Sequence, residues 1–264
     1  MKIKSILSYI LFIFVLITFN SKADTIFFDS KNIKIENEGN MIFASKGRAN
    51  IPSKNLLIEG DKFIYNKNLS ELIVIDDVKY FDNDNKIYIE SEKIIYNEIK
   101  NTIYSKGQTY IISDNTYKIN SFDILYDRNF NKISSIELTT IADENKNKFV
   151  FNKGLKFDLN YEIISSKEII VTDKNLNNYF FENSKVDLKI NEIIGKEIFV
   201  EFEDSFFGNK NNDPLLKGKG VISNNDKTRI YKTVFSTCSI ENKKCRGWEV
   251  QSQIFTHDKI KKLF

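Results

Sequence analysis

Three segments of this chain repeat one another at a spacing of about thirty residues. The segments 58–66 (IEGDKFIYN), 89–97 (IESEKIIYN) and 119–127 (INSFDILYD) align without gaps. A weaker copy, KNIKIEN at 31–37, comes one period earlier. Such a repeat indicates a stacked architecture, because a single unit is too small to bury its own apolar face and must pack on its neighbours.

The repeats have the residue pattern of β-strands. Ile87 and Ile89 lie on one face of an extended segment, and Tyr88 and Glu90 lie on the other. Asn, Asp and Gly interrupt these runs where turns are needed. We therefore expect two strands per repeat and an all-β fold, a repetitive antiparallel β-jelly roll of roughly 14–18 strands.

Some predicted strands are apolar on both faces, as in ELIVIDDV at 71–78. One face packs on the core, and the second must meet another sheet, a partner or a lipid. Two facing sheets would satisfy both faces. Their interior is then either a closed core or, if the sheets splay apart, an apolar groove.

The N-terminus has the features of a secretory signal peptide. Two lysines precede the apolar run 6–19, and Ser21 and Ala23 form a small-x-small cleavage signal, so residues 1–23 are expected to be removed. A membrane anchor is the alternative, but the run is shorter than the ~20 residues of a span. The segment carries three lysines and no acid, so the full chain's net charge of +3 falls to about neutral after cleavage. A neutral chain argues against nucleic-acid binding.

The residues needed for common catalytic sites are missing from the sequence. The chain has one histidine, His257, and no Gly-x-Ser-x-Gly motif, so a hydrolytic triad is not expected. The acidic pairs Asp76–Asp77 and Asp82–Asp84 lie in polar, turn-like stretches and are poor candidates for glycosidase carboxylates. We predict no enzyme activity, no cofactor and no metal site.

Both cysteines and the only tryptophan lie close to that histidine near the C-terminus. Six residues separate Cys238 from Cys245, and apolar strand-like segments flank them. A hairpin closed by a disulfide fits this spacing in an exported protein, and bridging to a segment beyond residue 264 is the alternative. A zinc site made with His257 would have a non-standard ligand spacing.

This C-terminal segment resembles the junction of the LPS-assembly protein family (LptD, also called OstA or organic solvent tolerance protein). The matching residues are Thr237, Cys238, Trp248, His257 and Asp258. The segment 206–220 resembles the family's Asn-x-Pro and Lys-Gly stretch, and the Ile…Tyr-Asn/Asp repeats are similar to its OstA-like units. Val78 departs from the pattern, since Gly47 and Gly107, two periods apart, predict glycine there.

The resemblance implies an architecture and a function. It divides the chain into a signal peptide (1–23), an OstA-like periplasmic roll (24–220) and a junction (221–264) towards a transmembrane β-barrel that the sequence does not contain. The roll would receive lipopolysaccharide acyl chains and pass them to the barrel at the outer membrane. The groove candidates, taken from the repeats with the choice of strand face left open, are Phe63, Tyr65, Ile94, Tyr96, Ile124 and Tyr126.

The same resemblance implies partners. These are lipopolysaccharide, a periplasmic LptA-like bridge protein joined by edge-strand pairing, and, in a full-length protein, the barrel with an LptE-like lipoprotein. In the family the periplasmic cysteines bridge to the barrel. Alternatives are a free-standing LptA- or LptC-like bridge protein, a carbohydrate-active β-solenoid enzyme and an inert structural sandwich.

Overall fold

The computed structural model describes residues 25–143, 148–172, 177–201, 215–236 and 249–261. The predicted signal peptide, Thr237, Cys238, Cys245 and Trp248 lie outside these ranges.

The described residues form eighteen strands and two short 3-10 turns, η1 (Asn37–Gly39) and η2 (Pro52–Lys54). The strands are β1 (Phe27–Glu36), β2 (Met41–Ile51), β3 (Leu56–Asn66), β4 (Glu71–Asp82), β5 (Ile87–Asn97), β6 (Thr102–Ser113), β7 (Tyr117–Phe122), β8 (Leu125–Asp127), β9 (Lys132–Ser135), β10 (Thr139–Ala142), β11 (Lys148–Phe151), β12 (Leu155–Asp158), β13 (Ile163–Thr172), β14 (Asn178–Asp187), β15 (Glu192–Glu201), β16 (Leu215–Ser223), β17 (Lys227–Ser236) and β18 (Glu249–Asp258).

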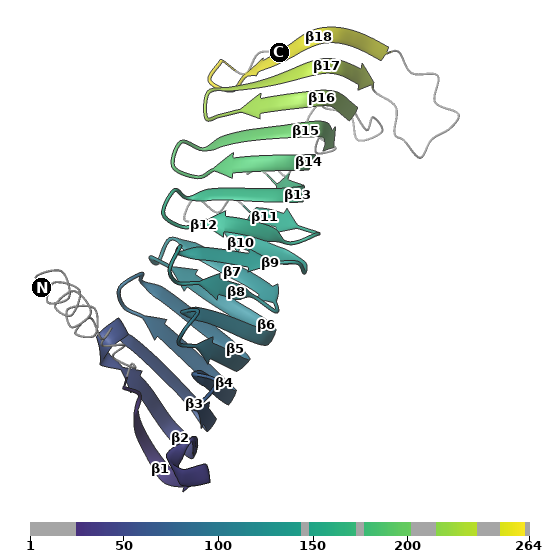
Figure 1. Cartoon of the computed structure of the whole chain (residues 1–264). Helices are drawn as coiled ribbons and strands as arrows, with labels where there is room; N and C mark the ends of the chain where they lie inside the picture. The colour runs from purple at the N-terminus through teal and green to yellow at the C-terminus, as the bar shows by residue number, and fades with distance from the viewer. Residues whose placement is uncertain (1–24, 144–147, 173–176, 202–214, 237–248, 262–264) are drawn as a thin grey trace, which may run out of the picture.

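All strands belong to one elongated antiparallel sheet that runs from β1 at one end to β18 at the other (Figure 1). Strands β1 to β6 pair in chain order, and so do β13 to β18. Between them the ladder divides into two tracks, β7–β10–β11 and β8–β9–β12, which rejoin at β13. Each short strand of either track therefore corresponds to one half of a longer strand that is interrupted at the bend.

Each long strand bends near its middle and so has two halves. Arm A consists of the halves that end at turns 52–55, 83–86 and 114–116. Arm B consists of the halves that end at turns 37–40, 67–70, 98–101, 128–131, 159–162 and 188–191. The equivalent halves of the remaining strands continue each arm through the ladder.

Left-handed backbone conformations accompany many of the bends. They occur at Lys46 in β2, Asp76 and Asp77 in β4, Gly107 in β6, Asp123 between β7 and β8, Gly154 between β11 and β12, Asn183 in β14, Glu197 in β15 and Lys232 in β17. An extra left-handed residue is a β-bulge, which sharpens the twist and turns a strand. In β4 the two aspartates make the bend, so Val78 replaces the expected glycine and is buried in the core.

The inner faces of the two arms pack on each other to form the core. Tyr117 on arm A meets Phe157 on arm B edge to face, with ring centroids 5.5 Å apart. Near the β1 end Phe28 and Phe63 make a similar contact at 6.1 Å. The sheet is thus folded over on itself, and its strands contribute apolar side chains to the interior from both arms.

The fold prediction is confirmed as an all-β, jelly-roll-like architecture. The structure replaces the expected pair of facing sheets with one bent sheet, because the mid-strand bulges let the same strands supply both layers. The predicted boundary at residue 220 falls inside β16, and the sheet continues past it to β18.

Candidate functional site

The six groove candidates all lie on arm B and face the interior. Each is at most 8% exposed, so all are buried in the core. The residues next to them along each strand point outward, so the six share the inner face of the sheet. The structure thus brings the six residues together, on β3, β5, the β7–β8 segment and β8.

A continuous row of cross-strand neighbours, which we call the interior row, runs along arm B. Its members oppose one another pairwise from β1 to β18: Ile35, Ile42, Tyr65, Leu72, Tyr96, Ile103, Tyr126, Ile133, Phe157, Ile164, Val186, Ile193, Ser223, Thr228 and His257. The row is apolar or aromatic as far as Ile193 and polar over its last three positions. An apolar path therefore spans most of the length of the roll.

The tips of the two arms meet along a line that we call the seam. Hydrogen bonds between side chains cross it at three places along its length: Lys54 with Tyr96, Asp82 with Arg128, and Tyr117 with Glu162. Tyr126 and Asp84 add further contacts at the second of these places. The donor–acceptor distances are 2.9 Å from Lys54 Nζ to Tyr96 Oη and 2.6 Å from Tyr117 Oη to Glu162 Oε2. Polar side chains thus close the mouth of a roll whose interior is apolar.

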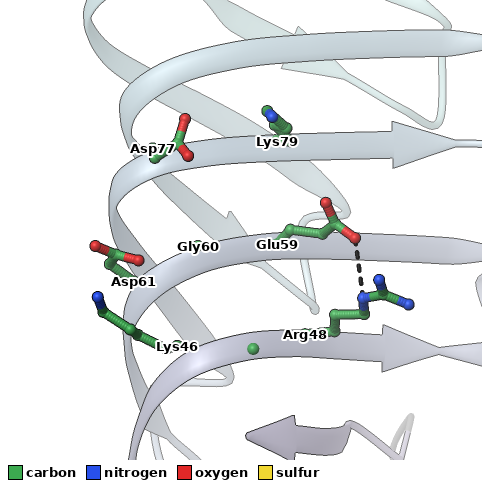
Figure 2. Close-up of a pocket in the computed structure, with 8 residues that line it drawn as sticks. Lys46, Arg48, Glu59, Gly60, Asp61, Asp77 and Lys79 are labelled. Carbon is green, nitrogen blue, oxygen red and sulfur yellow. Dashed lines mark ion pairs between the residues drawn. The ribbon is translucent and has the colours of Figure 1, made fainter.

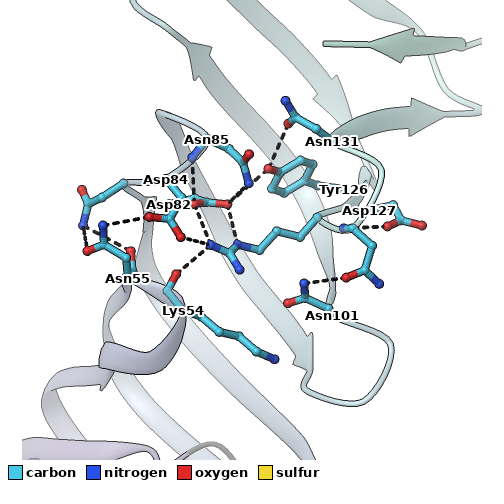
Figure 3. Close-up of polar contacts among 12 residues, drawn as sticks. Lys54, Asn55, Asp82, Asp84, Asn85, Asn101, Tyr126, Asp127 and Asn131 are labelled. Atoms are coloured by element: carbon cyan, nitrogen blue, oxygen red, sulfur yellow. Dashed lines mark hydrogen bonds and ion pairs between the residues drawn. The ribbon is translucent and has the colours of Figure 1, made fainter. Parts of the chain in front are cut away.

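Asp82 and Arg128 form a buried ion pair at the seam (Figure 3). Arg128 donates from Nε to Asp82 Oδ2 at 2.7 Å and from Nη2 to Oδ1 at 3.1 Å. The Asp82 side chain is fully buried, and that of Arg128 is 9% exposed. Arg128 Nη2 also bonds the Lys54 carbonyl at 2.6 Å, so it holds two strand ends of arm A.

The seam shifts the pKa values of its own residues. Burial alone lowers the pKa of Arg128, but hydrogen bonding and charge attraction from Asp82 outweigh it, and the net pKa is raised. Burial, followed by the negative charge of Asp82, raises the pKa of Tyr126, whose hydroxyl donates to that carboxylate at 3.2 Å. The guanidinium and the phenol therefore both remain protonated across the physiological pH range.

Tyr80 lies in the interior beside the seam and has an unsatisfied hydroxyl. The residue is fully buried, and among the described residues its Oη has no hydrogen-bond partner. Burial, with a further contribution from Asp82, raises its pKa well above the ordinary value of 10.0. A buried hydroxyl without a partner costs about 1–3 kcal/mol.

A polar hollow lies on the outside of the bend, where β2, β3 and β4 curve (Figure 2). It is lined by three basic and three acidic side chains, and Arg48 pairs there with Glu59 at 3.0 Å. The lining residues are Lys46, Gly47, Arg48, Glu59, Gly60, Asp61, Asp77 and Lys79. Because its charges balance, the hollow favours neither an anionic nor a cationic ligand.

The outer surface of arm B carries an apolar row of its own. Its members are Phe43, Ile64, Ile73, Ile95, Tyr104 and Leu125, which oppose one another across β2 to β6 and β8. Leu125 is 41% exposed, and the others are partly exposed. The strands that are apolar on both faces therefore place one face in the core and the other on the outside of the roll.

The ends of the roll are edge strands. Among the described residues, β1 pairs only with β2 and β18 only with β17. At the β1 edge Ile33 and Ile35 face the same side as the buried Ala44 and the partly buried Ile42, yet they are 49% and 62% exposed. The apolar interior thus reaches the surface at this edge.

Two residues of the C-terminal motif lie within the described part of the chain. His257 opposes Thr228 and ends the interior row. Asp258 accepts a hydrogen bond from the backbone N–H of Lys261 at 3.0 Å, and this bond is the main cause of its lowered pKa. Thr237, Cys238, Cys245 and Trp248 lie outside the described residues, so neither cysteine arrangement can be compared with the structure.

The seam is not predicted by the sequence analysis. Asp82 and Asp84 looked like parts of a polar turn, yet Asp82 is buried and ion-paired. The available signal was the rarity of arginine: four arginines occur among 39 basic residues, and Arg128 directly follows the repeated Tyr-Asp.

Comparisons with known proteins add no identification. No protein-family model matches the chain, and no curated protein matches it. In the part of the chain that the structure describes, no helix is long and apolar enough to cross a membrane.

Proposed function

We propose that the chain is a periplasmic lipopolysaccharide-transport domain that holds acyl chains inside the roll and passes them along it. The interior row carries this proposal, because its apolar side chains, which pack on one another in this structure, continue through many consecutive strands. Burial of apolar surface is worth about 25 cal/mol per Å², so acyl chains could be held there without covalent chemistry. The predicted signal peptide and the resemblance to the LPS-assembly family support the same function.

In this proposal the protein acts by binding and transfer rather than by catalysis. Lipid would move between equivalent apolar positions on successive strands and leave at one end of the sheet. Edge-strand pairing with a similar roll would extend the path, since backbone hydrogen bonds can join two sheets end to end. Supply by an LptA-like bridge protein and delivery to a membrane barrel with its LptE-like lipoprotein fit this arrangement.

A second candidate is a free-standing bridge protein of the LptA or LptC type. It would also use the two edge strands, β1 and β18, each paired on one side only among the described residues. A bridge would use both edges for similar rolls, whereas a translocon domain would use one edge for a bridge and the other for its barrel.

The test uses a photo-crosslinking amino acid at two adjacent positions of β5. Tyr96 faces the interior and Ile95 the outside, so the two variants differ mainly in the face they probe. With purified lipopolysaccharide and the mature chain, we expect crosslinked lipid from position 96 and little from position 95. Equal labelling, or labelling from position 95 alone, would contradict binding inside the roll.

A further inference from the structure

The interior of the roll is closed to solvent where the seam crosses β3 to β8. Tyr80, Tyr96 and Tyr126 are fully buried there, although they lie next to the tips of the arms. An acyl chain that reaches this part of the interior must either travel from an end of the sheet or pass between the arms.

A buried ion pair such as Asp82–Arg128 is an unusual contact for holding two arms of a sheet permanently together. Replacing a buried ion pair by packed apolar residues is often neutral or stabilising, so burial of charge is a poor way to make a permanent closure. Charged groups differ from apolar ones in the open state, because water solvates both ions once the arms separate. An ionic seam can therefore open at a lower cost than an apolar seam of the same size.

The unsatisfied hydroxyl of Tyr80 is a second, independent observation at the same place. Tyr80 is on β4, two residues before Asp82, and points into the interior from arm A. A buried donor without an acceptor gains a hydrogen bond if a ligand brings a carbonyl, ester or hydroxyl oxygen to it. Such oxygens lie near the polar end of an acyl chain.

We propose that the seam at Asp82 and Arg128 is a side port through which acyl chains pass between the arms, and that Tyr80 donates a hydrogen bond to the oxygen at the polar end of the chain. This inference rests on the proposed function, because it requires that the interior binds acyl chains. It adds a lateral route to the route from the ends of the sheet.

The test measures uptake and release of cis-parinaric acid, a fatty acid whose fluorescence rises in apolar surroundings, by stopped flow with the mature chain. Arg128→Gln removes one ion, and we expect uptake and release to become faster by about tenfold or more. The double variant Asp82→Leu/Arg128→Leu makes the seam apolar and should slow both. Lys86→Gln, which breaks the exposed Lys86–Asp114 pair on an arm A turn, is the matched control and should leave both rates unchanged.

The outcomes of this test distinguish a failure of the side port from a failure of the proposed function on which it rests. If the wild-type chain takes up no probe, the proposed function fails. If the wild type takes up the probe and both seam variants keep its rates, the port is wrong and loading occurs from the ends. Should Arg128→Gln not fold, as judged by circular dichroism, Arg128→Lys and the double variant give the same comparison.

Tyr80→Phe tests the hydrogen bond without altering the seam. We expect its affinity for cis-parinaric acid to fall by roughly threefold to tenfold, in line with the loss of one buried hydrogen bond. Its affinity for a hydrocarbon polyene of similar length, which has no oxygen, should be unchanged. An equal effect on both probes, or none on either, would exclude Tyr80 as the donor.

Discussion

Arg128 and Asp82 belong to opposite arms of the folded sheet, yet two hydrogen bonds join their side chains at 2.7 and 3.1 Å. The two residues are 46 positions apart in the sequence. Arg128 also bonds the carbonyl of Lys54 and the carboxylate of Asp84, so one guanidinium connects arm B to two turns of arm A. A single guanidinium therefore joins the two arms through three acceptor groups: the Asp82 carboxylate, the Asp84 carboxylate and the Lys54 carbonyl.

Removing the guanidinium should destabilise the protein strongly. Arg128→Gln leaves the Asp82 carboxylate buried without its counter-ion, and breaking a buried pair in this way costs about 3–5 kcal/mol. Replacing both residues by leucine removes both charges and should cost much less. Urea denaturation of the two variants measures the difference, and equal losses of unfolding free energy would show that packing rather than charge matters here.

Tyr80 and Tyr126 should respond in opposite ways to removal of the hydroxyl. Tyr80→Phe deletes a buried group that has no partner among the described residues, so we expect the free energy of unfolding to rise by up to about 1 kcal/mol. Tyr126→Phe deletes a hydroxyl that contacts Asp82 and Asn131, and stability should fall by about 1–3 kcal/mol. Thermal melts of the two variants provide the comparison, and a loss of stability in Tyr80→Phe would indicate an ordered water on its hydroxyl.

Alternation along single strands predicted the β character of the chain and much of the core. Ile87 and Ile89 share a face in the structure, and the aligned tyrosines Tyr65, Tyr96 and Tyr126 are in the same interior row. These features follow from local periodicity and from repetition, and both can be read from one sequence.

The bends could not be predicted in the same way. Ile89 and Ile94 are an odd number of positions apart, so strict alternation would place them on opposite faces, yet both are buried in the interior. An irregularity of register between Ser91 and Lys93 reverses the phase of the alternation. The seam could not be predicted for the same reason. Asp82 and Arg128 are 46 positions apart, and they meet only because the strands between them bend.

Alkaline pH should unfold the protein. Burial raises the folded-state pKa values of Tyr80 and Tyr126 above the ordinary value of 10.0 that applies in the unfolded chain. Above about pH 10 the unfolded state loses these protons while the folded state keeps them, so the stability falls as the pH rises. Tyrosinate absorbance should therefore appear together with the loss of β-sheet circular dichroism. Titration of all tyrosines before unfolding would contradict this assignment.

The β1 edge should contribute to binding of a similar roll. Ile33 and Ile35 are exposed at this edge although they face the side of the core, and burying one isoleucine contributes about 1.5–3 kcal/mol. Ile35→Asp should therefore weaken binding of a purified LptA-like bridge protein by about tenfold or more. Ile99→Asp is the control, since Ile99 is 78% exposed in a turn away from the edge. Equal effects of the two changes, measured by biolayer interferometry, would argue against pairing at β1.

Gly107 should be one of the few glycines that the bends require. Its φ is +87°, a conformation in which a β-carbon is unfavourable by about 1–2 kcal/mol, so Gly107→Ala should lower the stability by that amount. A β-carbon there would lie 3.0 Å from Glu92 Oε2, the far end of a flexible side chain that can move aside, so the backbone dominates the cost.

Two further variants test this explanation. Gly107→Asn should cost less than Gly107→Ala, because asparagine enters the left-handed region more readily. Gly220→Ala in β16 is the matched control: its nearest neighbours would be 3.9 Å away and its φ is not in the left-handed region, so stability should hold or rise by about 0.4–1 kcal/mol. If alanine cost the same at both glycines, the bend in β6 would depend on the absence of a side chain rather than on the left-handed backbone.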